Sequence, residues 1–527
     1  MSGSEPPARA VAWPQALLAI ALVWTVIERV PLVMNAETHL DSDLAVDGLT
    51  LIEATQGHWR WHFPGTPTVG SAPLLLLAPI AIIWGLTPES LGIGGVLLAC
   101  LVVASTFRLA RVAFGPEVAA WSLIPLAFAS TGTLWLSGRI TGGHLLAVAW
   151  HAIAFAGLHA NLRHGGKFRA AGLGVWCGLG LWIDSMFLIS LLGLVAAGSA
   201  AWTLSGRSRT GLRSGLIFTL AVVVGLTPKL VGDRVDPHDA YRETFVPDWN
   251  ADVLLSHAKT LGLDCLPRLL VGHRLPDLEA EPGGFTFDGR TKSATRSTGL
   301  IPIVMTALGL VVFLLSILSF AHGCGADPNR ARWAVRWGLS LTSAGVVAGF
   351  ILNRNIYNSD NYRYLVFLLV PAAVGFGRTL RWLSMKGQGG AISASLLGLL
   401  FVTTFTLDLA AWYRQFGWMS ESGRPIHRTL DDPMLDWLNT HSEVRSLFGD
   451  YWDVYRYAML TEGRVVGVPS PRYPNRFPEW SSRMPAGRSS IALARPNAIG
   501  AEIHAGAIRD GGTVVFSSRG GVILEWP

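Results

Sequence analysis

The sequence predicts an α-helical protein that crosses a membrane many times and ends in a small α/β domain. Half of the 527 residues are hydrophobic and only 15% are charged, whereas roughly 25% of the residues of an ordinary soluble domain are charged. The apolar residues gather in runs that are nearly free of charge over about the 20 residues that a helix needs to cross a bilayer. A soluble fold would have to bury each of these helices on all sides, so a soluble protein is excluded.

About eleven membrane spans follow when the short basic clusters are placed on the cytoplasmic side, as the positive-inside rule requires. The clusters are Arg108/Arg111, Arg163/Lys167/Arg169, Arg207/Arg209/Arg213, Arg330/Arg332/Arg336 and Arg378/Arg381/Lys386. The predicted spans lie near residues 12–34, 90–107, 117–136, 143–161, 170–183, 186–203, 214–231, 299–320, 337–352, 364–383 and 391–411. The first of them is too long for the apolar core of a signal peptide, so we expect it to be retained.

One further apolar run, residues 73–86, is left out of this count. If it crossed the membrane, all five basic clusters would lie on the outer side, against the positive-inside rule. We therefore expect it to lie in or near the outer interface without crossing. The transmembrane domain then covers residues 1–411, with outer loops at about 35–89 and 232–298.

The C-terminal residues, 412–527, face outward in this topology and are predicted to form a compact α/β domain. Asp432 before Pro433 is a good start for the helix MLDWLNTH, because a capping carboxylate and a proline suit the unpaired N–H groups of a first turn. A second helix-like segment, AIGAEIHAGAIRD, alternates with strand-like runs. These runs lie at 464–469, 489–494 and 513–516.

Composition also limits the partners. The net charge is +6, but the basic residues lie in short clusters between apolar segments, so we predict no nucleic-acid partner. The four cysteines form no CxxC motif and suggest no pair, so neither a zinc site nor a disulfide framework is predicted. We predict no cofactor, and the use of a divalent cation stays open.

The densest acidic cluster outside the predicted spans follows the first span directly and consists of Glu37, Asp41, Asp43, Asp47 and Glu53. Asp43 and Asp47 can share one helix face, but Asp41 cannot share it with both. In the simpler interpretation the cluster is a solvated loop in which Asp43 caps the following helix. In the functional interpretation it holds a carboxylate base at the membrane surface, where partial burial tunes its pKa.

Several segments in order carry a resemblance. They are Asp41-Ser42-Asp43 followed by AVDGL, HFPGTPTVGSAPLLLLAPIAIIWGLTPESL, RITGGHLLAVAWHAIAFAGLHANLRHGG, GLGVWCGLGLWIDS, DNYRYLVFLLVP and DYWDVYRYAMLTEGRVVGVPSPRYP. Their order and topology resemble the membrane glycosyltransferases of the GT-C fold, the superfamily of protein mannosyltransferases and aminoarabinose transferases. The likeness is greatest to the bacterial branch, and the interfacial 73–86 segment fits the same fold.

The resemblance implies an inverting hexosyl- or pentosyltransferase of the bacterial inner membrane, whose C-terminal domain is extracytoplasmic. It implies a polyprenyl-phosphate sugar donor, surrounding membrane lipids and an outer-loop carboxylate that acts as general base toward an acceptor hydroxyl. The acidic pair of the family falls on Asp43 and Leu44, where Leu44 replaces the usual Glu. We expect Asp43 to be the base and Asp41 the second catalytic carboxylate. The sugar and the acceptor are not identified.

A phosphate leaving group needs cationic stabilisation more than acid catalysis. The candidates on the outer side are Arg139 and His144 in RITGGH, and Arg363 beside Tyr362 in NYRYL. Asp47, one helical turn beyond Asp43, completes the predicted substrate-binding set. The arginines are equally well explained as anchors at the membrane interface, and His144 as an interface histidine.

Two other polar segments have simple structural interpretations. Asp184, in LWIDS, fits a turn with a helix cap. The aromatic-rich DYWDVYRY fits the core of the C-terminal domain, although its rings would also stack on a sugar.

Two other functions remain open beside the glycosyltransferase. A transporter or flippase of a lipid-linked substrate usually has ionisable residues in mid-span and paired repeats. The predicted spans are almost devoid of such residues and show no repeat, which favours chemistry at the surface. A non-catalytic relative that binds a polyprenyl lipid is kept open by the leucine at position 44.

Overall fold

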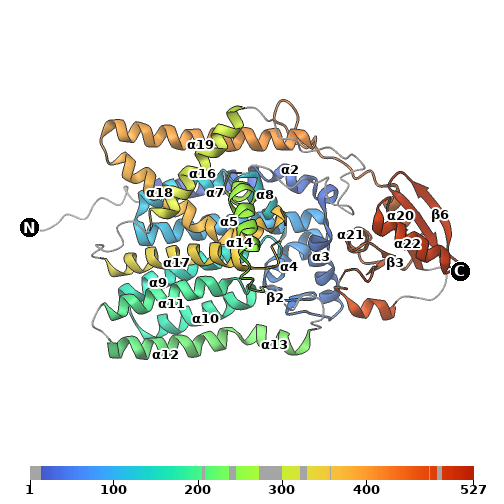
Figure 1. Ribbon diagram of the computed structural model, residues 1–527, viewed down its shortest axis with the longest axis horizontal. Coiled ribbons are helices and arrows are strands. Elements are labelled where there is room, and N and C mark those ends of the chain that lie inside the picture. The colour runs from blue at the N-terminus through green and yellow to red at the C-terminus, as the bar shows by residue number, and fades with distance from the viewer. Residues whose placement is uncertain are drawn as a thin grey trace, which may run out of the picture.

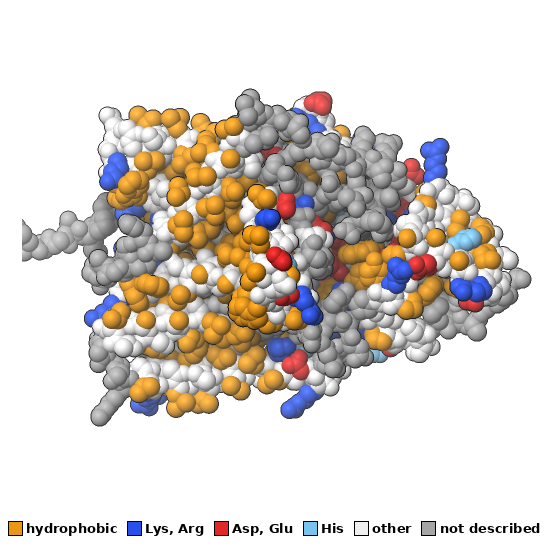
Figure 2. All heavy atoms as spheres, in the orientation of Figure 1, with side chains coloured by type: hydrophobic (Ala, Val, Ile, Leu, Met, Phe, Trp, Pro, Cys, Tyr) orange, Lys and Arg blue, Asp and Glu red, His pale blue; other side chains and the backbone are white. Residues whose placement is uncertain are grey.

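The structure is a computed structural model, and it describes residues 13–204, 208–236, 245–271, 300–320, 329–356, 358–473, 475–483 and 490–526. A bundle of long, nearly parallel helices forms one part of the molecule, and a mixed α/β domain caps one end of it (Figure 1). Hydrophobic side chains cover the middle of the bundle, and Lys and Arg side chains gather toward its ends (Figure 2). This pattern is the one expected of a helical bundle in a bilayer.

All eleven predicted spans coincide with helical segments. In chain order the bundle contains α1 (Trp13–Ile27), α2 (Val30–Met34), α5 (Pro88–Phe114), α6 (Pro116–Ser122), α7 (Ile124–Ala127), α8 (Thr131–Ser137), α9 (Leu145–His164), α10 (Lys167–Ile183), α11 (Phe187–Thr203), α12 (Ser208–Gly225), α13 (Thr227–Val235), α16 (Leu300–Leu318), α17 (Arg330–Leu352), η5 (Ser359–Leu368), α18 (Leu369–Ser384) and α19 (Gln388–Gln415). Within the described residues, seven helices are long and apolar enough to cross a membrane, or eight with one bent pair. The chain is a multi-pass membrane protein.

The central helix α5 shows how local sequence sets a span. Thr87 and Ser90 form a reciprocal capping box, and Pro88 occupies the first turn, where its missing N–H costs nothing. The helix runs for 27 residues, or about 40 Å at 1.5 Å per residue, enough to cross the hydrocarbon core. It packs against α1, α4, α6 and α9.

The span predicted at 117–136 is not one straight helix. The segments Pro116–Ala127 and Thr131–Ser137 meet at a bend of 80°. Ser130 starts the second segment by accepting a hydrogen bond from the Thr133 N–H at 3.1 Å. A new helix cap thus replaces continued helical hydrogen bonding, and the chain turns beneath the loop that carries Arg139.

The segment left out of the span count forms α4 (Ala72–Trp84), which lies against α5. Its 13 residues reach about 20 Å, less than the roughly 30 Å of hydrocarbon in a bilayer. Ile82, Ile83 and Trp84 at its end are exposed. The length agrees with the expectation that this segment does not cross.

The first outer loop holds η2 (Ala36–His39), α3 (Ser42–Thr55) and a small antiparallel hairpin of β1 (His62–Phe63) and β2 (Thr66–Gly70). The second contains α14 (Ala251–Thr260), the π-turn η3 (Leu261–Cys265) and α15 (Leu266–Val271). Residues 237–244 and 272–298 of the predicted second loop lie outside the described residues.

The C-terminal domain is built on a five-stranded mixed sheet in the order β4-β3-β5-β7-β6. Its elements are α20 (Pro433–Thr440), β3 (Ser446–Gly449), α21 (Tyr451–Leu460), β4 (Val466–Pro469), η6 (Pro478–Arg483), β5 (Ser490–Ala494), α22 (Ala498–Arg509), β6 (Thr513–Ser518) and β7 (Gly521–Glu525). The sequence predicted the helices α20 and α22 and the strands β4, β5 and β6. It missed the helix α21 and the strands β3 and β7, which lie inside the sheet rather than at its edges.

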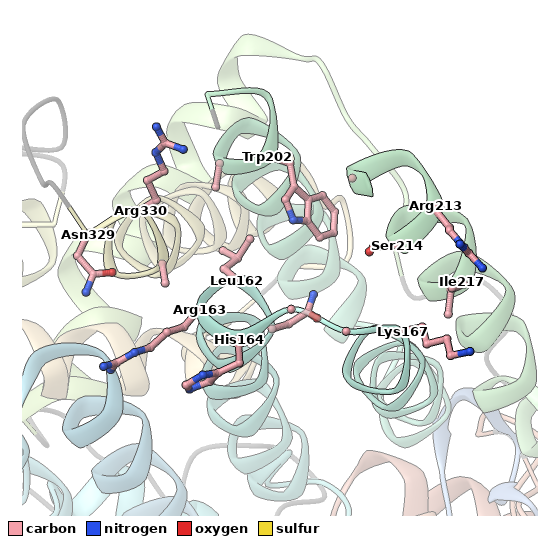
Figure 3. Close-up of a pocket in the computed structure, with 16 residues that line it drawn as sticks. Leu162, Arg163, His164, Lys167, Trp202, Arg213, Ser214, Ile217, Asn329 and Arg330 are labelled. Atoms are coloured by element: carbon pink, nitrogen blue, oxygen red, sulfur yellow. The ribbon is translucent and has the colours of Figure 1, made fainter. Parts of the chain in front are cut away.

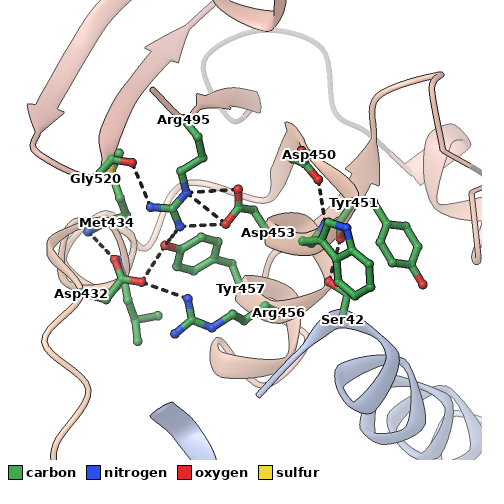
Figure 4. A network of polar contacts seen from close by, with 12 residues as sticks. Ser42, Asp432, Met434, Asp450, Tyr451, Asp453, Arg456, Tyr457, Arg495 and Gly520 are labelled. Atoms are coloured by element: carbon green, nitrogen blue, oxygen red, sulfur yellow. Dashed lines mark hydrogen bonds and ion pairs between the residues drawn. The ribbon is translucent and has the colours of Figure 1, made fainter. Parts of the chain in front are cut away.

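A buried polar network holds this domain together (Figure 4). Asp432 caps α20 and accepts a hydrogen bond from the Tyr457 hydroxyl at 2.7 Å. Arg495 donates to Asp453 at 2.7 Å and to the Tyr457 hydroxyl at 2.8 Å. Because each buried charge has partners, the network avoids the cost of an isolated ion. The DYWDVYRY segment is thus largely domain core, as its simpler interpretation predicted.

The C-terminal domain docks on the bundle through α21, which packs against α3. The Ser42 hydroxyl donates to the Tyr451 carbonyl at 2.7 Å, and the Trp480 indole donates to Glu53 at 3.1 Å. Figure 4 shows the Tyr451 side chain pointing away from the Arg495 network. The docking therefore presents α21 to the acidic helix of the first outer loop.

Candidate active site

Helix α3 carries the three predicted aspartates to the junction between the bundle and the C-terminal domain. Asp41 is its N-cap and accepts a hydrogen bond from the Leu44 N–H at 2.8 Å. The simpler interpretation, in which Asp43 caps this helix, is therefore wrong, because the helix begins at Ser42 and Asp43 lies in its first turn. Leu44, at the position of the missing second acid, is buried.

Asp43 lies between two arginines and a tyrosine. The Tyr451 hydroxyl donates to its Oδ1 at 2.7 Å. Arg476 Nη2 lies 3.7 Å from Oδ1, and Arg363 Nη1 lies 3.8 Å from Oδ2. The carboxylate keeps 19% of its surface exposed, so it remains reachable.

These neighbours set the charge of Asp43. Burial alone would raise the pKa of its carboxyl, but the charges of Arg476 and Arg363 and the Tyr451 hydrogen bond outweigh it and lower the pKa. Burial also raises the pKa of the Tyr451 phenol, so this group stays protonated and donates. The resting carboxylate of Asp43 is ionised.

Asp41 forms an ion pair with Arg139, whose guanidinium lies 5.4 Å from the centre of the Trp135 ring. Burial raises the pKa of Asp41 in spite of this pair, and the nearby negative charge of Asp43 adds to the rise. The pKa values of the two carboxyls thus move in opposite directions. Such a separation is typical of acid–base sites.

Asp47 does not face open space. It is buried and accepts hydrogen bonds from the Thr141 hydroxyl at 2.5 Å and the Thr141 N–H at 3.1 Å. Burial raises its pKa to about 7, against the effect of those hydrogen bonds. Its place in the structure is to hold the turn that follows Arg139.

His144 starts α9 with a left-handed backbone, φ 54°, and its Nδ1 lies 2.6 Å from Asp184 Oδ2. Asp184 also accepts a hydrogen bond from the Met186 N–H at 2.8 Å. The turn predicted for Asp184 is present, and the pair with His144 was not foreseen, because 40 residues separate them in the chain.

In the NYRYL segment, one residue makes a structural contact and another lies at the candidate site. The buried Tyr362 donates from its hydroxyl to the Gly132 carbonyl at 3.1 Å. Arg363 faces Asp43 and lies 5.4 Å from the Tyr364 ring centre.

Sequence reasoning missed Arg476. It is buried, and its Nε donates to the Tyr451 hydroxyl at 3.0 Å, which in turn donates to Asp43. Its Nη1 donates to the Pro64 carbonyl at 3.0 Å and to the Thr66 hydroxyl at 2.6 Å. Nothing in the local sequence marks this arginine. The only signal was the tyrosine-rich segment DYWDVYRY, which supplies Tyr451.

One cavity of about 800 Å³ joins these groups to the lipid-facing surface. Its polar end is lined by Asp43, Thr141, His144, Asp184, Arg363 and Arg476. Its apolar part runs between α11 and α17 and is lined by Leu188, Ile189, Leu192, Gly193, Ala196, Leu341, Gly345, Val346, Ala348, Gly349 and Leu352. Of the predicted site residues it contains Asp43, His144 and Arg363. Asp41, Asp47, Arg139 and Tyr362 lie behind its wall.

The described residues hold no group of three or more His, Cys, Asp or Glu side chains placed to bind a metal ion. The cavity places a carboxylate beside guanidinium groups.

No protein-family model matches the sequence, and a comparison with curated protein sequences finds no match. Solved structures are similar to it in fold. The aminoarabinose transferase ArnT from Cupriavidus metallidurans bound to undecaprenyl phosphate superposes with a TM-score of 0.57 at 12% identity, over 98% of each chain. The same enzyme in the apo state gives 0.56. The archaeal oligosaccharyltransferase AglB from Archaeoglobus fulgidus, in complex with an inhibitory peptide and a dolichol-phosphate, gives a TM-score of 0.51 at 12% identity, over 92% of this chain and 70% of that one.

The chain has the GT-C fold. The resemblance found in the sequence is thereby confirmed for the fold, and the match to ArnT includes the C-terminal domain because it extends over nearly the whole chain.

Proposed function

We propose that this GT-C chain is an inverting glycosyltransferase that moves a sugar from a polyprenyl-phosphate donor to an acceptor hydroxyl. The observation that carries the proposal is an ionised carboxylate, Asp43, between two arginines at the polar end of an otherwise apolar cavity. A long apolar chain, a phosphate and a proton acceptor would each find a matching surface there.

The apolar part of the cavity suits an isoprenoid chain. It opens between α11 and α17, where Leu188, Leu192 and Leu341 are exposed toward the lipid. An isoprenoid chain lying there would pass from the bilayer into the cavity without contacting water, and keeping apolar surface out of water is favourable. ArnT, similar in fold, was solved with undecaprenyl phosphate.

The arginines suit the phosphate. Guanidinium groups match phosphate oxygens in geometry and charge. Arg363 and Arg476 would stabilise the charge that grows on the phosphate as its bond to the sugar breaks. Drawing these cations toward a phosphate would also remove the main cause of the low pKa of Asp43. Binding of the donor would thus make Asp43 a stronger base when it is needed.

The reaction then follows in one displacement. The acceptor oxygen forms a bond to the anomeric carbon as the bond from that carbon to the phosphate oxygen breaks, and the configuration inverts. The acceptor proton passes to Asp43, and the electron pair of the broken bond leaves with the polyprenyl phosphate. General-base catalysis of this kind is typically worth about 10²- to 10⁴-fold in rate.

Asp41 would support the site indirectly, through its ion pair with Arg139, and would not act as a second base. We place the cavity and the C-terminal domain outside the cytoplasm of a bacterial inner membrane, because the short basic clusters gather at the opposite end of the bundle. The sugar and the acceptor follow from no contact in the structure.

The test is sugar transfer in membranes supplied with hexosyl and pentosyl polyprenyl phosphates one at a time. We expect one of them to be consumed, and Asp43→Asn to lower the rate by about 10²-fold or more while expression is unchanged. Asp436→Asn, an exposed aspartate of α20, is the matched control and should keep the native rate. Equal rates for the native chain and Asp43→Asn would exclude this base, and consumption of no donor would favour a transporter or a lipid-binding protein.

A further inference from the structure

A histidine and an aspartate from different helices form a pair in the wall of the large cavity. His144 precedes α9 and Asp184 caps the end of α10, and their side chains are only 7% and 3% exposed. His144 Nδ1 lies 2.6 Å from Asp184 Oδ2, and both residues line the polar end of the cavity. No step of the proposed reaction uses this pair, which we call the dyad.

Asp184 is held in place from two sides. Its second oxygen, Oδ1, accepts a hydrogen bond from the Met186 N–H at 2.8 Å. The next residue, Ser185, donates its N–H to the Thr68 carbonyl at 2.8 Å, which ties the same turn to the β1–β2 hairpin. Because both carboxylate oxygens of Asp184 accept hydrogen bonds and the side chain is nearly buried, Asp184 orients His144 and does not itself present a binding surface.

The contact with Asp184 sets the role of each ring nitrogen of His144. A carboxylate accepts hydrogen bonds, so the proton of the neutral imidazole lies on Nδ1, and Nε2 is the acceptor. Among the described residues Nε2 makes no hydrogen bond, and it is not one of the enclosed side-chain atoms that lack a partner. In its neutral form the ring therefore presents an acceptor to the cavity.

Tyr364 lies between the dyad and an arginine that suits the donor phosphate. Its ring centre is 6.0 Å from that of His144 and 5.4 Å from the guanidinium of Arg363. A cation that matches a phosphate and an acceptor that matches a hydroxyl thus lie beside one aromatic ring. A sugar phosphate carries both kinds of group close together, so its hydroxyls would reach the dyad when its phosphate faces Arg363.

We propose that His144 is a specificity-determining residue whose Nε2 accepts a hydrogen bond from a hydroxyl of the transferred sugar, and that Asp184 is its positioning residue. The inference rests on the proposed function, because it names the sugar contact of the same cavity. The ligand is then a sugar with a free hydroxyl at one particular ring position. A sugar without that hydroxyl would leave the acceptor unpaired in an enclosed site, which weakens binding.

The place of the dyad favours the transferred sugar over the acceptor molecule. Asp184 lies in the turn that leads into α11, and Leu188 of the same helix lines the apolar part of the cavity. A donor lipid with its chain in that apolar part would bring its own sugar to the dyad. The acceptor hydroxyl would instead approach Asp43, which takes its proton in the proposed reaction.

The other end of α9 provides a matched control. His164 is the last of the 20 residues of this helix, about 30 Å along the axis from its start. It is exposed and lines an open hollow of about 1290 Å³, where Figure 3 shows it beside Arg163. A substitution there changes a histidine of the same helix without touching the candidate active site.

The test is equilibrium binding of lipids to the full chain in detergent, followed by tryptophan fluorescence. The probes are polyprenyl phosphate without a sugar and its mannosyl, glucosyl and arabinosyl derivatives. The monodeoxy analogues of the sugar lipid that binds most tightly complete the set. We expect the loss of one particular hydroxyl to weaken binding to the native chain about tenfold, and the loss of the others to have less effect.

His144→Asn removes the acceptor but suits the backbone, because asparagine tolerates the left-handed conformation, φ 54°, of this residue. It should bind the parent sugar lipid about tenfold more weakly, bind the critical deoxy analogue no worse than the parent, and bind polyprenyl phosphate as the native chain does. His144→Gln, whose amide oxygen can reach the place of Nε2, should keep part of the preference and remains informative if His144→Asn fails to fold. His164→Asn should match the native chain with every lipid.

Three results would overturn the inference. Equal weakening of the sugar lipids and of polyprenyl phosphate in His144→Asn would mean that His144 binds the phosphate or supports the fold. An unchanged preference among the deoxy analogues in His144→Asn would place the sugar contact elsewhere and leave His144 to the acceptor. Both results leave the proposed function standing, whereas binding of no sugar lipid by the native chain would overturn that function as well.

Discussion

The two ends of the helical bundle both hold arginines inside cavities, but they pair those arginines differently. At the end that carries the C-terminal domain, Arg139 faces Asp41, and both Arg363 and Arg476 face Asp43. At the opposite end, the hydrogen bonds of Arg332, Arg336 and Arg378 to backbone carbonyls come from the ends of α5 and α16.

This difference concerns which contacts can supply a proton acceptor. A carboxylate that an incoming phosphate can free from its arginines becomes a proton acceptor at the moment of binding. A carbonyl cannot take a proton in this way. An arginine beside an apolar groove is therefore not enough to indicate catalysis. A carboxylate next to that arginine is needed as the proton acceptor.

The largest expected effect concerns the pH dependence of stability, which only the end with carboxylates should show. Burial raises the pKa of Asp47 to about 7 in the folded chain, so the folded state binds a proton that the unfolded state has already lost. The contribution of this group to stability is full below about pH 4 and is lost as the pH rises through 7, by about 4 kcal/mol in all.

Asp47→Asn keeps an acceptor for Thr141 but cannot ionise, so its unfolding midpoint should fall less over this range than that of the native chain. The midpoint can be followed by the fluorescence of the 21 tryptophans in detergent. The exposed control Asp436→Asn should follow the native curve, and a native midpoint that stays level would contradict the prediction.

Arg476→Gln should lower the rate of sugar transfer, which tests the pairing of arginine with carboxylate at the end that carries the C-terminal domain. The change removes a buried cation beside Asp43, and losing one member of a buried charged pair costs about 3 kcal/mol, or roughly a hundredfold in rate. The pKa of Asp43 should also rise, because Arg476 is the charge that lowers it most. The activity needs the ionised form, so its acidic limb should move to higher pH.

The measurement is a pH profile of the transfer rate, with Arg332→Gln, at the start of α17 at the opposite end of the bundle, as the control. The control should keep both the rate and the profile. A hundredfold loss with an unmoved acidic limb would mean that Arg476 supports the fold and not the charge of Asp43.

Tyr451→Phe tests whether the C-terminal domain takes part in the chemistry. The phenol links Arg476 to Asp43 by two hydrogen bonds, and a hydrogen bond to a charged group is worth about 1.5–3 kcal/mol. We expect a loss of roughly tenfold in transfer rate with an unchanged unfolding midpoint. A native rate would show that the domain only docks beside the site.

Gly349→Leu should give the smallest effect and test the apolar groove. A Cβ at this position would meet Ile189 Cδ1 at 3.6 Å, so the larger side chain extends into the space between α11 and α17. We expect about 1 kcal/mol weaker use of a long polyprenyl donor, roughly fivefold, and less with a short-chain donor.

Gly215→Leu is the matched control for helix propensity, because nothing lies within 4 Å of an added Cβ there. Transfer rates at several donor concentrations separate the outcomes. An equal loss with short and long donors would place the polyprenyl chain elsewhere.

The helical architecture was largely predictable because it rests on local patterns. Runs of apolar residues located helical segments at all eleven predicted positions, of which seven or eight are long and apolar enough to cross a membrane within the described residues. The basic clusters led to the expectation that residues 73–86 do not cross. The break at Ser130 could not be predicted in this way, because a capping serine and a bend leave the average hydropathy of the segment unchanged. Strands of four or five residues are too short to show a period, so β4 and β5 were found while β3 and β7, which are equally short, were missed.

The site was predictable only in part. Asp43, His144 and Arg363 lie in the cavity because they follow directly from spans whose outer ends meet. Asp41, Asp47 and Arg139 were expected to bind or react, but hydrogen bonds and ion pairs turn them inward, and those partners are distant in sequence. A spacing along one helix says which residues share a face, and not what covers that face.

The sequence by itself determined the helical membrane fold, the acidic helix after the first span and the resemblance to the GT-C fold, because periodicity, charge bias and segment order are properties of the chain. Only the tertiary structure decided the charge of Asp43. Arg476 reaches it across 433 positions of sequence, from a domain whose docking depends on packing between α3 and α21. Electrostatic energy depends on distance in space, and the order of residues does not contain that distance.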